Sequence, residues 1–211
     1  MAPRSAMHDD ALARAPGRLD DRALDQLFRQ ARSVRSWQQR EVSADVLRQL
    51  YELMRLGPTS ANCQPARVHF VVGARARARL LPLLDAGNVE PTRHAPVTAV
   101  VGFDLRFYEN LPRLYAHQPD AVSWFNASTA SAREAALRNG SLQGGYFIMA
   151  ARALGLDCGP MGGFDASAAA REFFPGADVE VNFLCNLGYG QPGSRYPRLP
   201  RLEFDEACVI S

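Results

Sequence analysis

The 211-residue chain contains no lysine, because all 24 residues of the lysine and arginine class are arginine. Without lysine the protein cannot form a Schiff base with a carbonyl substrate or with pyridoxal phosphate. It also cannot supply the lysine of a Walker-type phosphate loop. Any phosphate that the chain binds must therefore be held by arginine side chains and backbone N–H groups.

Long apolar runs are also missing. No run approaches the roughly 20 apolar residues that a membrane helix needs, and residues 1–17 lack the apolar core of a secretory signal. We therefore expect a cytoplasmic protein without membrane contacts. The net charge is only +2 and the arginines are scattered, which argues against a nucleic-acid-binding surface.

Residues that would mark metal sites or nucleophilic catalysis are not grouped. The four histidines form no HExxH pattern, and no serine stands in a GxSxG turn. The cysteines form no CxxC pair, so we predict four buried thiols: Cys63, Cys158, Cys185 and Cys208. We therefore predict no metal site, and the hydrolase and metalloenzyme classes have little support.

One glycine motif, at residues 188–193, matches the GxGxxG pattern of dinucleotide-binding folds. Such a site needs a helix to begin there, so that the helix N-terminus meets the pyrophosphate. Pro192, Pro197 and Pro200 disfavour this helix, and we interpret the match as accidental.

Apolar residues with helical spacing predict two helices early in the chain. The first begins near Asp20 or Asp21, and its apolar face would consist of Leu24, Leu27, Phe28 and Ala31. The second follows Ser43 and ends before Gly57-Pro58. Its buried side chains would be Leu47, Leu50, Tyr51 and Met54.

Segments rich in β-branched residues predict strands at residues 67–73, 96–103 and 179–189. A helical pattern over residues 74–84 separates the first two. Residues 104–131 are irregular and aromatic, which is typical of a connection that covers an active site.

A long helix is predicted over residues 132–154, with Gly155 after its end. Its second half is apolar on nearly all sides, which predicts burial in a core or in a subunit interface. Gly144-Gly145 would let a partner backbone approach closely. Because no linker or repeat interrupts the chain, we expect one domain over residues 21–211 after a flexible tail at residues 1–20.

Three separate segments suit one phosphorylated, planar ligand. Residues 32–35 (RSVR) offer two guanidinium groups and a hydroxyl, although arginines at a helix end also offset the helix dipole. Residues 57–65 (GPTSANCQP) place hydroxyl and amide groups between two prolines, and the alternative is an ordinary polar turn. Glycines in residues 155–164 would let the backbone approach a flat ligand.

In this order the segments resemble the nitroreductase family of FMN enzymes. The resemblance rests on RSVR, GPTSANCQP, ALGLDCGPMGGFD at residues 153–165 and RLPRL at residues 198–202, and it covers about residues 22–207. It implies an α+β fold with three α/β/α layers and a mixed, mostly antiparallel sheet flanked by helices. It also implies an intertwined homodimer.

The resemblance implies a cofactor site built from both ends of the chain. The FMN phosphate and ribityl chain would be held by Arg32, Ser33, Arg35, Arg198 and Arg201. Residues near the flavin ring or the ribityl group would be Asn88, Asn139, Met161, Gly162 and Gly163. Many relatives have a glutamate where Gly162 stands, so that side-chain contact would be lost. The other subunit would contribute Pro58, Thr59, Ser60, Asn62 and Gln64.

Within the family, PTSANC followed by PAR, SWF at residues 123–125 and RLPRLEFDEAC most resemble the malonic semialdehyde reductases of pyrimidine degradation. Ala66 stands where the usual nitroreductase has an aromatic residue. The resemblance to these reductases implies that NADPH or NADH gives hydride to flavin N5. The flavin then passes the hydride to a small carbonyl acceptor, reducing malonic semialdehyde to 3-hydroxypropionate. No side chain need be catalytic. The substrate-binding candidates are Arg67, Trp124, Phe125 and Arg138, with an arginine pairing with the substrate carboxylate.

Two alternatives remain open. The same fold and cofactor suit a broad-specificity reductase of nitroaromatics or quinones. A non-catalytic FMN-binding dimer is the other alternative, and only the behaviour of the bound flavin separates it from an enzyme.

Overall fold

The computed structural model describes residues 17–211. Most of the tail expected at residues 1–20 therefore lies outside the described residues. From residue 17 the chain is extended until Asp20, whose side chain accepts a hydrogen bond from the backbone N–H of Ala23 at 2.7 Å. This bond caps α1 (Asp21–Leu24), which continues as a wider π-helical turn over Asp25–Arg29.

The centre of the molecule is a four-stranded sheet in the order β1-β2-β4-β3. Its strands are β1 (Ala66–Val72), β2 (Val97–Asp104), β3 (Asp157–Met161) and β4 (Val179–Gly188). All three strand pairings are antiparallel. Among the described residues, parallel pairing outside the strands is confined to one bridge between Ser33 and Cys158.

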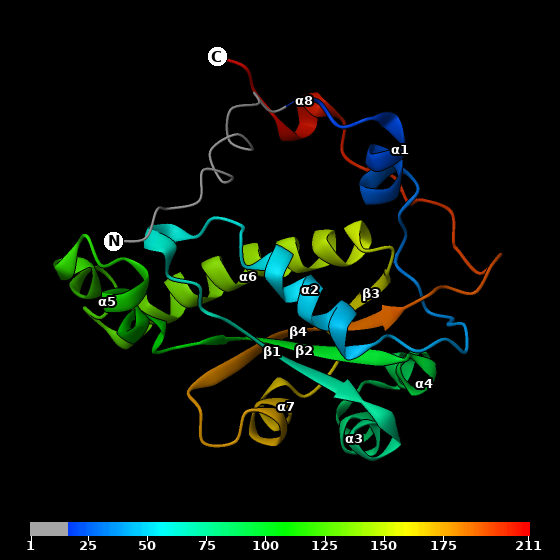
Figure 1. Ribbon diagram of the computed structural model, residues 1–211, viewed down its shortest axis with the longest axis horizontal. Helices are drawn as coiled ribbons and strands as arrows, with labels where there is room; N and C mark the ends of the chain where they lie inside the picture. The colour runs from blue at the N-terminus through cyan, green and yellow to red at the C-terminus, as the bar shows by residue number, and fades with distance from the viewer. Residues whose placement is uncertain (1–16) are drawn as a thin grey trace, which may run out of the picture.

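Helices cover both faces of this sheet (Figure 1). On one face lie α2 (Ala44–Met54) and α6 (Thr129–Ala153), which pack on β1 and β2 around Phe147. On the other lie α3 (Gly73–Leu80) and α7 (Ala166–Phe173), which pack around Val100 and Leu184. Since β2 is buried on both sides, every residue from Val97 to Phe103 is buried. The three-layer α/β/α prediction is confirmed.

Two apolar side chains of the predicted helices are exposed in this chain, and no residue of the first helix is fully buried. Ser43 caps α2 as expected, and Leu47, Leu50 and Met54 are buried. Tyr51, however, is 45 % exposed, and Phe28 of the first helix is 53 % exposed. The single chain provides no second layer over these two positions, so periodicity identified the helices but overstated their burial.

The long helix α6 is capped by Ser128 and Ser131, which accept hydrogen bonds from each other's backbone N–H. Gly155 follows its end with a φ of 78°, a left-handed conformation that glycine adopts without strain. The apolar second half of α6 is not buried on all sides within one chain, because Leu142 is 45 % exposed. Its burial in a subunit interface stays a prediction. No helix of the described residues combines the length and apolarity needed to cross a bilayer.

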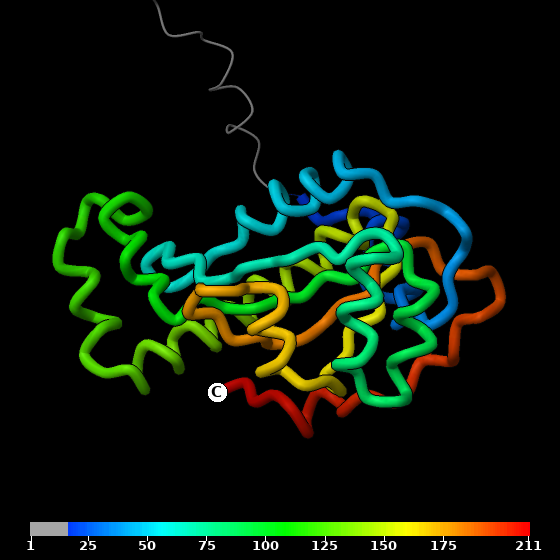
Figure 2. The backbone as a smooth tube through the Cα atoms, turned by 90° about the horizontal axis from the view of Figure 1, so that it is seen from below, coloured from blue at the N-terminus to red at the C-terminus, as the bar shows by residue number. Residues whose placement is uncertain are grey.

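The irregular connection at residues 104–131, here called the cover, folds into short turns around α5 (Leu111–Leu114). The proline-rich segment at residues 192–203, here called the arm, leads to α8 (Phe204–Ala207) without a helix after the GxGxxG match. The cover and the arm lie at opposite ends of the molecule (Figures 1 and 2). Sequence patterns missed α4 (Ala86–His94), β3 and α7.

Three cysteines are buried as predicted, namely Cys63, Cys158 and Cys185. The prediction is wrong for Cys208, which is exposed just after α8. Cys208 follows α8, which has no buried residue, so no core surrounds its thiol.

Candidate functional site: a cofactor-binding site in two halves

The first half of the site is the arginine half, which consists of residues 32–35, Asn88, residues 161–163 and Arg198. Residues 32–35 run beside β3, since the N–H of Val34 donates to the carbonyl of Cys158 at 2.9 Å. This approach is close enough to require a glycine in the strand. A Cβ at Gly159 would lie 2.5 Å from the Val34 carbonyl oxygen.

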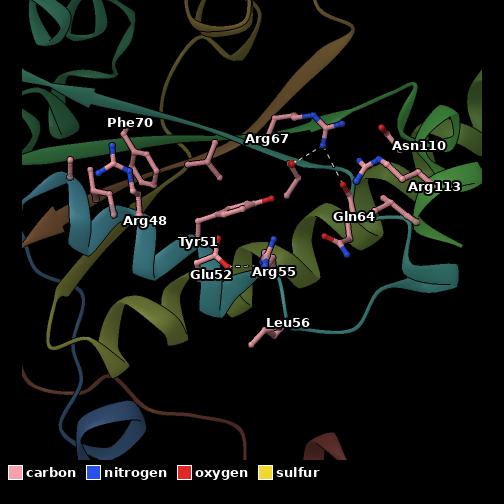
Figure 3. A pocket seen from close by; sticks show the side chains of 15 residues that line it. Arg48, Tyr51, Glu52, Arg55, Leu56, Gln64, Arg67, Phe70, Asn110 and Arg113 are labelled. Atoms are coloured by element: carbon pink, nitrogen blue, oxygen red, sulfur yellow. Dashed lines mark hydrogen bonds and ion pairs between the residues drawn. The ribbon is translucent and has the colours of Figure 1, made fainter. Parts of the chain in front are cut away.

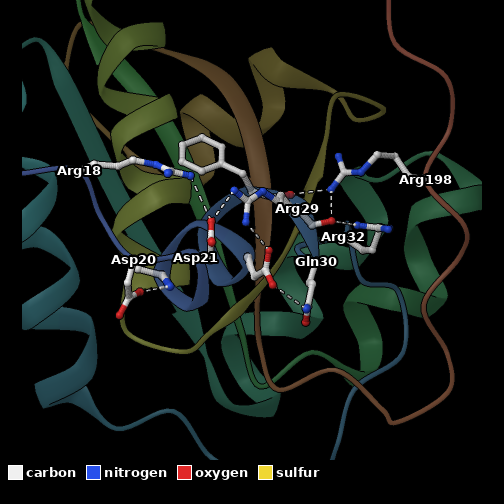
Figure 4. A network of polar contacts seen from close by, with 10 residues as sticks. Arg18, Asp20, Asp21, Arg29, Gln30, Arg32 and Arg198 are labelled. Carbon is white, nitrogen blue, oxygen red and sulfur yellow. Dashed lines mark hydrogen bonds and ion pairs between the residues drawn. The ribbon is translucent and has the colours of Figure 1, made fainter.

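Both ends of the described chain meet at this half (Figure 4). The guanidinium of Arg198, in the arm, donates to the carbonyls of Phe28, Arg29 and Ala31 at 2.6, 2.9 and 3.1 Å. Arg32 donates to the last two carbonyls at 2.9 Å. Both arginines therefore also offset the carbonyl end of the first helix. A guanidinium has five N–H groups, and one nitrogen on each side chain makes these bonds.

The charge here is not neutralised within the described chain. Arg32, Arg35 and Arg198 have no carboxylate partner among residues 17–211, whereas neighbouring Arg29 is paired with Asp21 and Asp25 at 2.9 Å each. Desolvated or clustered cations without an anion favour binding of a multiply charged anion such as phosphate. Arg201 also lacks a described carboxylate partner, but it donates only to carbonyls of its own segment, Leu199 and Pro200.

The N-terminus of α4 joins residues 161–163 to the arginines. Asn88 Nδ2 donates to the carbonyl of Gly163 at 2.9 Å, and Arg35 donates to the carbonyl of Gly87. A Cβ at Gly163 would lie 2.7 Å from Asp85 Oδ2, so this glycine allows the contact. At Gly162 a Cβ would meet nothing within 4 Å. A cavity of about 450 Å³ opens there between Met161, Gly162 and one face of α6.

The second half is the loop half, which consists of residues 57–66 and Asn139. Three of its residues adopt left-handed backbone conformations without being glycine: Ala61, Asn62 and Gln64 have φ values of 49°, 51° and 40°. Such a conformation costs on the order of 1 kcal/mol or more per residue. It persists only where surrounding contacts determine the backbone path.

Those contacts come from within the loop, from the cover and from α6. The N–H of Gln64 donates to Thr59 Oγ1 at 3.2 Å, and Gln64 Nε2 donates to Asn62 Oδ1 at 2.7 Å. Asn62 Nδ2 donates to the carbonyl of Leu114 in the cover at 2.9 Å. Beneath the loop, Cys63 is fully buried, and this burial raises the pKa of its thiol to about 11 despite a hydrogen bond with Thr59.

Asn139 lies with this loop and not with the arginine half. It is 1 % exposed, its Oδ1 accepts from the N–H of Ser60 at 2.8 Å, and its Nδ2 donates to the carbonyl of Ala135 at 2.9 Å. Both ends of its amide are thus bonded inside the chain. Its predicted contact with a cofactor stays a prediction, while its contact with the loop is observed.

The substrate candidates lie near the loop half, and both arginines are paired. Arg67 forms a 2.5 Å ion pair with Asp104, and Arg138 pairs with Glu134 one helical turn away. Trp124 is 53 % exposed, and the ring of Phe125 packs against Phe107 with a centroid distance of 5.2 Å.

A groove of about 950 Å³ runs between α2 and β1 beside these residues (Figure 3). At its end the side chains of Arg67 and Arg113 point toward each other above Gln64. Arg113 has no carboxylate partner in the described part of the chain, and sequence reasoning did not single it out. Elsewhere in the groove, Arg48 and Arg55 pair with Asp45 and Glu52, so most of its positive charge is neutralised.

In one chain the arginines at residues 32–35 and the loop half lie toward different ends of α6. Asn139 of α6 touches the loop, whereas Arg152 of the same helix donates to the carbonyl of Leu27 beside the arginine half at 2.9 Å. Thirteen helical residues correspond to about 20 Å at 1.5 Å per residue. The arginines at residues 32–35 therefore lie far along α6 from the loop in the same chain.

Solved structures share this fold. A protein of Bacillus subtilis, ydfN, provisionally named a nitroreductase, superposes with a TM-score of 0.81 at 24 % identity, over 89 % of this chain and 98 % of that one. A protein of Exiguobacterium sibiricum in complex with FMN, also provisionally named a nitroreductase, superposes with a TM-score of 0.79 at 21 % identity, over 89 % and 96 %.

Sequence comparison gives the family. The model named "Nitroreductase family" matches residues 28–189, and the chain belongs to this family. A protein of Stenotrophomonas maltophilia, provisionally named NADH dehydrogenase/NAD(P)H nitroreductase, is 54 % identical over 193 residues, which are 92 % of this chain and 98 % of that protein. A protein of Polynucleobacter asymbioticus with the same provisional name is 52 % identical over 91 % and 97 %.

Proposed function

We propose that this protein is an FMN-dependent NAD(P)H oxidoreductase of the cytoplasm that works as a homodimer and reduces a small carbonyl acceptor. The observation that carries the proposal is a set of arginines without described acidic partners: Arg32 and Arg198 share the carbonyls of Arg29 and Ala31, and Arg35 lies at the N-terminus of α4. The names of the relatives support an NAD(P)H-linked reaction, and the Exiguobacterium structure supports FMN as the cofactor.

The donor set of the arginine half fits FMN. Two ends of the chain supply guanidinium groups for the phosphate, and Arg201 would join them if the arm shifts onto the ligand. The hydroxyl of Ser33 lies between Arg32 and Arg35 in sequence and is exposed. Asn88, Met161 and Gly163 shape the surface on which the ring would lie, and Gly162 leaves it free of a side chain. When bound, FMN supplies the hydride chemistry, accepting hydride from NADPH or NADH and returning it to the acceptor.

A second copy of the chain would supply the loop half of each site. Its loop would contribute Pro58, Thr59, Ser60, Asn62 and Gln64. Exposed apolar side chains on α6 and at the C-terminal end of α2 support a dimer, because a water-exposed apolar face favours association. They are Leu53, Leu56 (two residues beyond α2), Leu137 and Leu142. The arm supports an intertwined form, because Leu199 is 75 % exposed and Ile210, beyond α8, is 85 % exposed.

For the acceptor we propose malonic semialdehyde, which would be reduced to 3-hydroxypropionate. The motifs shared with malonic semialdehyde reductases support this choice. Trp124 and Phe125 would lie over the substrate, and Arg67 or Arg138 would pair with its carboxylate. Because both arginines already have acidic partners, the carboxylate would join an existing ion pair. Replacing both arginines should raise KM for malonic semialdehyde but not for propanal, which has no carboxylate.

The deciding experiment starts with the purified protein. We expect it to bind FMN in a dimer and to bleach anaerobically with NADPH or NADH. Malonic semialdehyde should then give a larger kcat/KM than a quinone or a nitroaromatic compound. The reverse order would favour the broad-specificity reductase, and bound FMN that never bleaches would favour the non-catalytic dimer. A colourless monomer that takes up no FMN would overturn the proposal.

A further inference from the structure

The loop at residues 57–66 adopts a backbone path that its own sequence does not favour. The left-handed residues Ala61, Asn62 and Gln64 are not glycines, and alanine has no side chain that bonds locally to support this conformation. The side-chain bonds inside the loop join Thr59, Asn62 and Gln64 only. The two ends of the loop must therefore be held from outside.

One stripe on α6 contacts both ends and the middle of this path. Tyr146 Oη donates to the carbonyl of Pro58 at 3.0 Å, near the start of the loop. Asn139 Oδ1 accepts from the N–H of Ser60 at 2.8 Å. Gln143 Oε1 accepts from the N–H of Ala66 at 2.9 Å, where the loop becomes β1.

The three side chains are spaced i, i+4 and i+7, so they lie on one face of the helix. Asn139 and Gln143 are 1 % and 2 % exposed, although they lie in an otherwise apolar helix face. A buried amide is unfavourable unless it is hydrogen-bonded. Each bond goes to loop backbone, so the stripe determines the course of the chain whatever side chains the loop carries.

Packing adds to the hydrogen bonds at the start of the loop. A Cβ at Gly57 would lie 2.1 Å from Cδ2 of Tyr146, so the glycine backbone rests directly on the tyrosine ring. The ring and its hydroxyl thereby hold two consecutive residues, Gly57 and Pro58.

We propose that Asn139, Gln143 and Tyr146 are positioning residues that hold the strained loop in the shape with which it closes on the flavin of a second copy. The closing step rests on the proposed function, but the holding of the loop does not. Neither Gln143 nor Tyr146 contacts the arginine half in this chain, so their effect on the cofactor must pass through the loop.

The test compares Gln143→Leu with Gln143→Glu. Leucine removes the acceptor and leaves the N–H of Ala66 without its partner, whereas glutamate keeps an oxygen at the same reach. Tyr146→Phe is a second probe, because it removes one hydroxyl and keeps the ring on Gly57. The control for lost stability is Phe147→Leu on the same helix, α6. It weakens the core contact between Phe147 and Phe70 of β1.

Two measurements are made on each full-length variant: amide hydrogen exchange of residues 58–66 in the apo form, and the Kd for FMN. Gln143→Leu and Tyr146→Phe should speed exchange of the loop about tenfold, with β2 unchanged, and should raise the Kd about three- to tenfold. Gln143→Glu should restore both values to within about threefold. Phe147→Leu should lower Tm while leaving loop exchange and the Kd near those of the parent.

Unchanged loop exchange in Gln143→Leu and Tyr146→Phe would overturn the inference. So would a Kd that follows Tm across all four variants, because the residues would then act only through stability. Faster exchange without any change in FMN binding would retain the holding role and overturn the closing of this loop on the flavin. If no variant or parent binds FMN, the exchange data still decide the holding role, and the proposed function alone fails.

Discussion

The arginine half and the loop half differ in how far their polar groups are already used. In the arginine half, Arg32, Arg35 and Arg198 donate only to backbone carbonyls and keep uncompensated charge within the described chain. In the loop half, Asn139 has both ends of its amide bonded, and the left-handed residues are held at several points. One half offers free charge, and the other offers a fixed shape.

This difference indicates two kinds of recognition. Charge attracts a phosphate with little geometric demand, because several N–H groups of each arginine can rotate onto its oxygens. A heterocycle edge needs donors and acceptors at fixed places, which a preorganised loop supplies without ordering cost on binding. The two halves should therefore respond differently to mutation.

The largest expected effect is on the charged half. In Arg32→Ala/Arg35→Ala two charge-assisted contacts are removed, each contributing about 1.5–3 kcal/mol, so Kd for FMN should rise roughly 10²- to 10⁴-fold. Riboflavin has no phosphate, and its affinity should barely change; fluorescence titration of the apo protein measures both. Arg171→Ala, at an exposed position of α7, is the control. Equal losses for FMN and riboflavin would show that the arginines shape the site rather than bind phosphate.

The next effect concerns the loop half and its buried thiol. With the Cys63 pKa near 11 instead of 9, the thiolate fraction at pH 8 is roughly 100-fold smaller. Iodoacetamide should therefore modify exposed Cys208 at least about 100-fold faster than Cys63, as mass spectrometry of the peptides would show. Against a Cys208→Ser background, Asn139→Ala should speed Cys63 modification and Arg32→Ala should not. Similar acceleration by both changes would mean that the halves are not independent.

The smallest effect separates two adjacent glycines of the arginine half. Gly163→Ala forces a methyl against Asp85 and Asn88, which should destabilise the chain by about 1–3 kcal/mol and lower Tm by roughly 2–10 °C. Gly162→Ala meets open space, so Tm should shift by about 1 °C or less while FMN affinity falls. Calorimetry and flavin titration check the pair. A fall in Tm for Gly162→Ala, or unaltered FMN affinity, would remove Gly162 from the ring surface.

Much of the fold could be predicted from local patterns, and the exceptions have local causes. β1, β2 and α2 lie within two residues of their predicted starts, because runs of β-branched residues, Ser43 and Gly57-Pro58 are strong signals. The strand β3 was missed because Gly159 and Pro160 disfavour strands in general. Gly87 and Pro91 likewise obscured α4.

The candidate site also contains residues that the sequence identified and residues that it did not. Residues 32–35 and 57–65 were identified by their donors and acceptors, but Gln143 and Tyr146 were counted as part of an apolar helix. The i, i+4, i+7 spacing of polar groups with Asn139 was the available signal. Which of these residues bind a ligand and which hold a loop depends on their hydrogen-bond partners, and spacing alone does not give those.

The sequence by itself determined that arginine must bind any phosphate, where β1, β2, β4 and α2 lie, and that the chain resembles flavin reductases. Only the tertiary structure decided that Arg198 reaches the carbonyl of Ala31 across 167 positions and that Asn139 serves the loop. The physical reason is the separation along the chain over which each kind of interaction acts. Propensity, capping and periodicity act over a few residues, whereas contacts between distant segments depend on how the whole sheet and its covering helices bring the chain together.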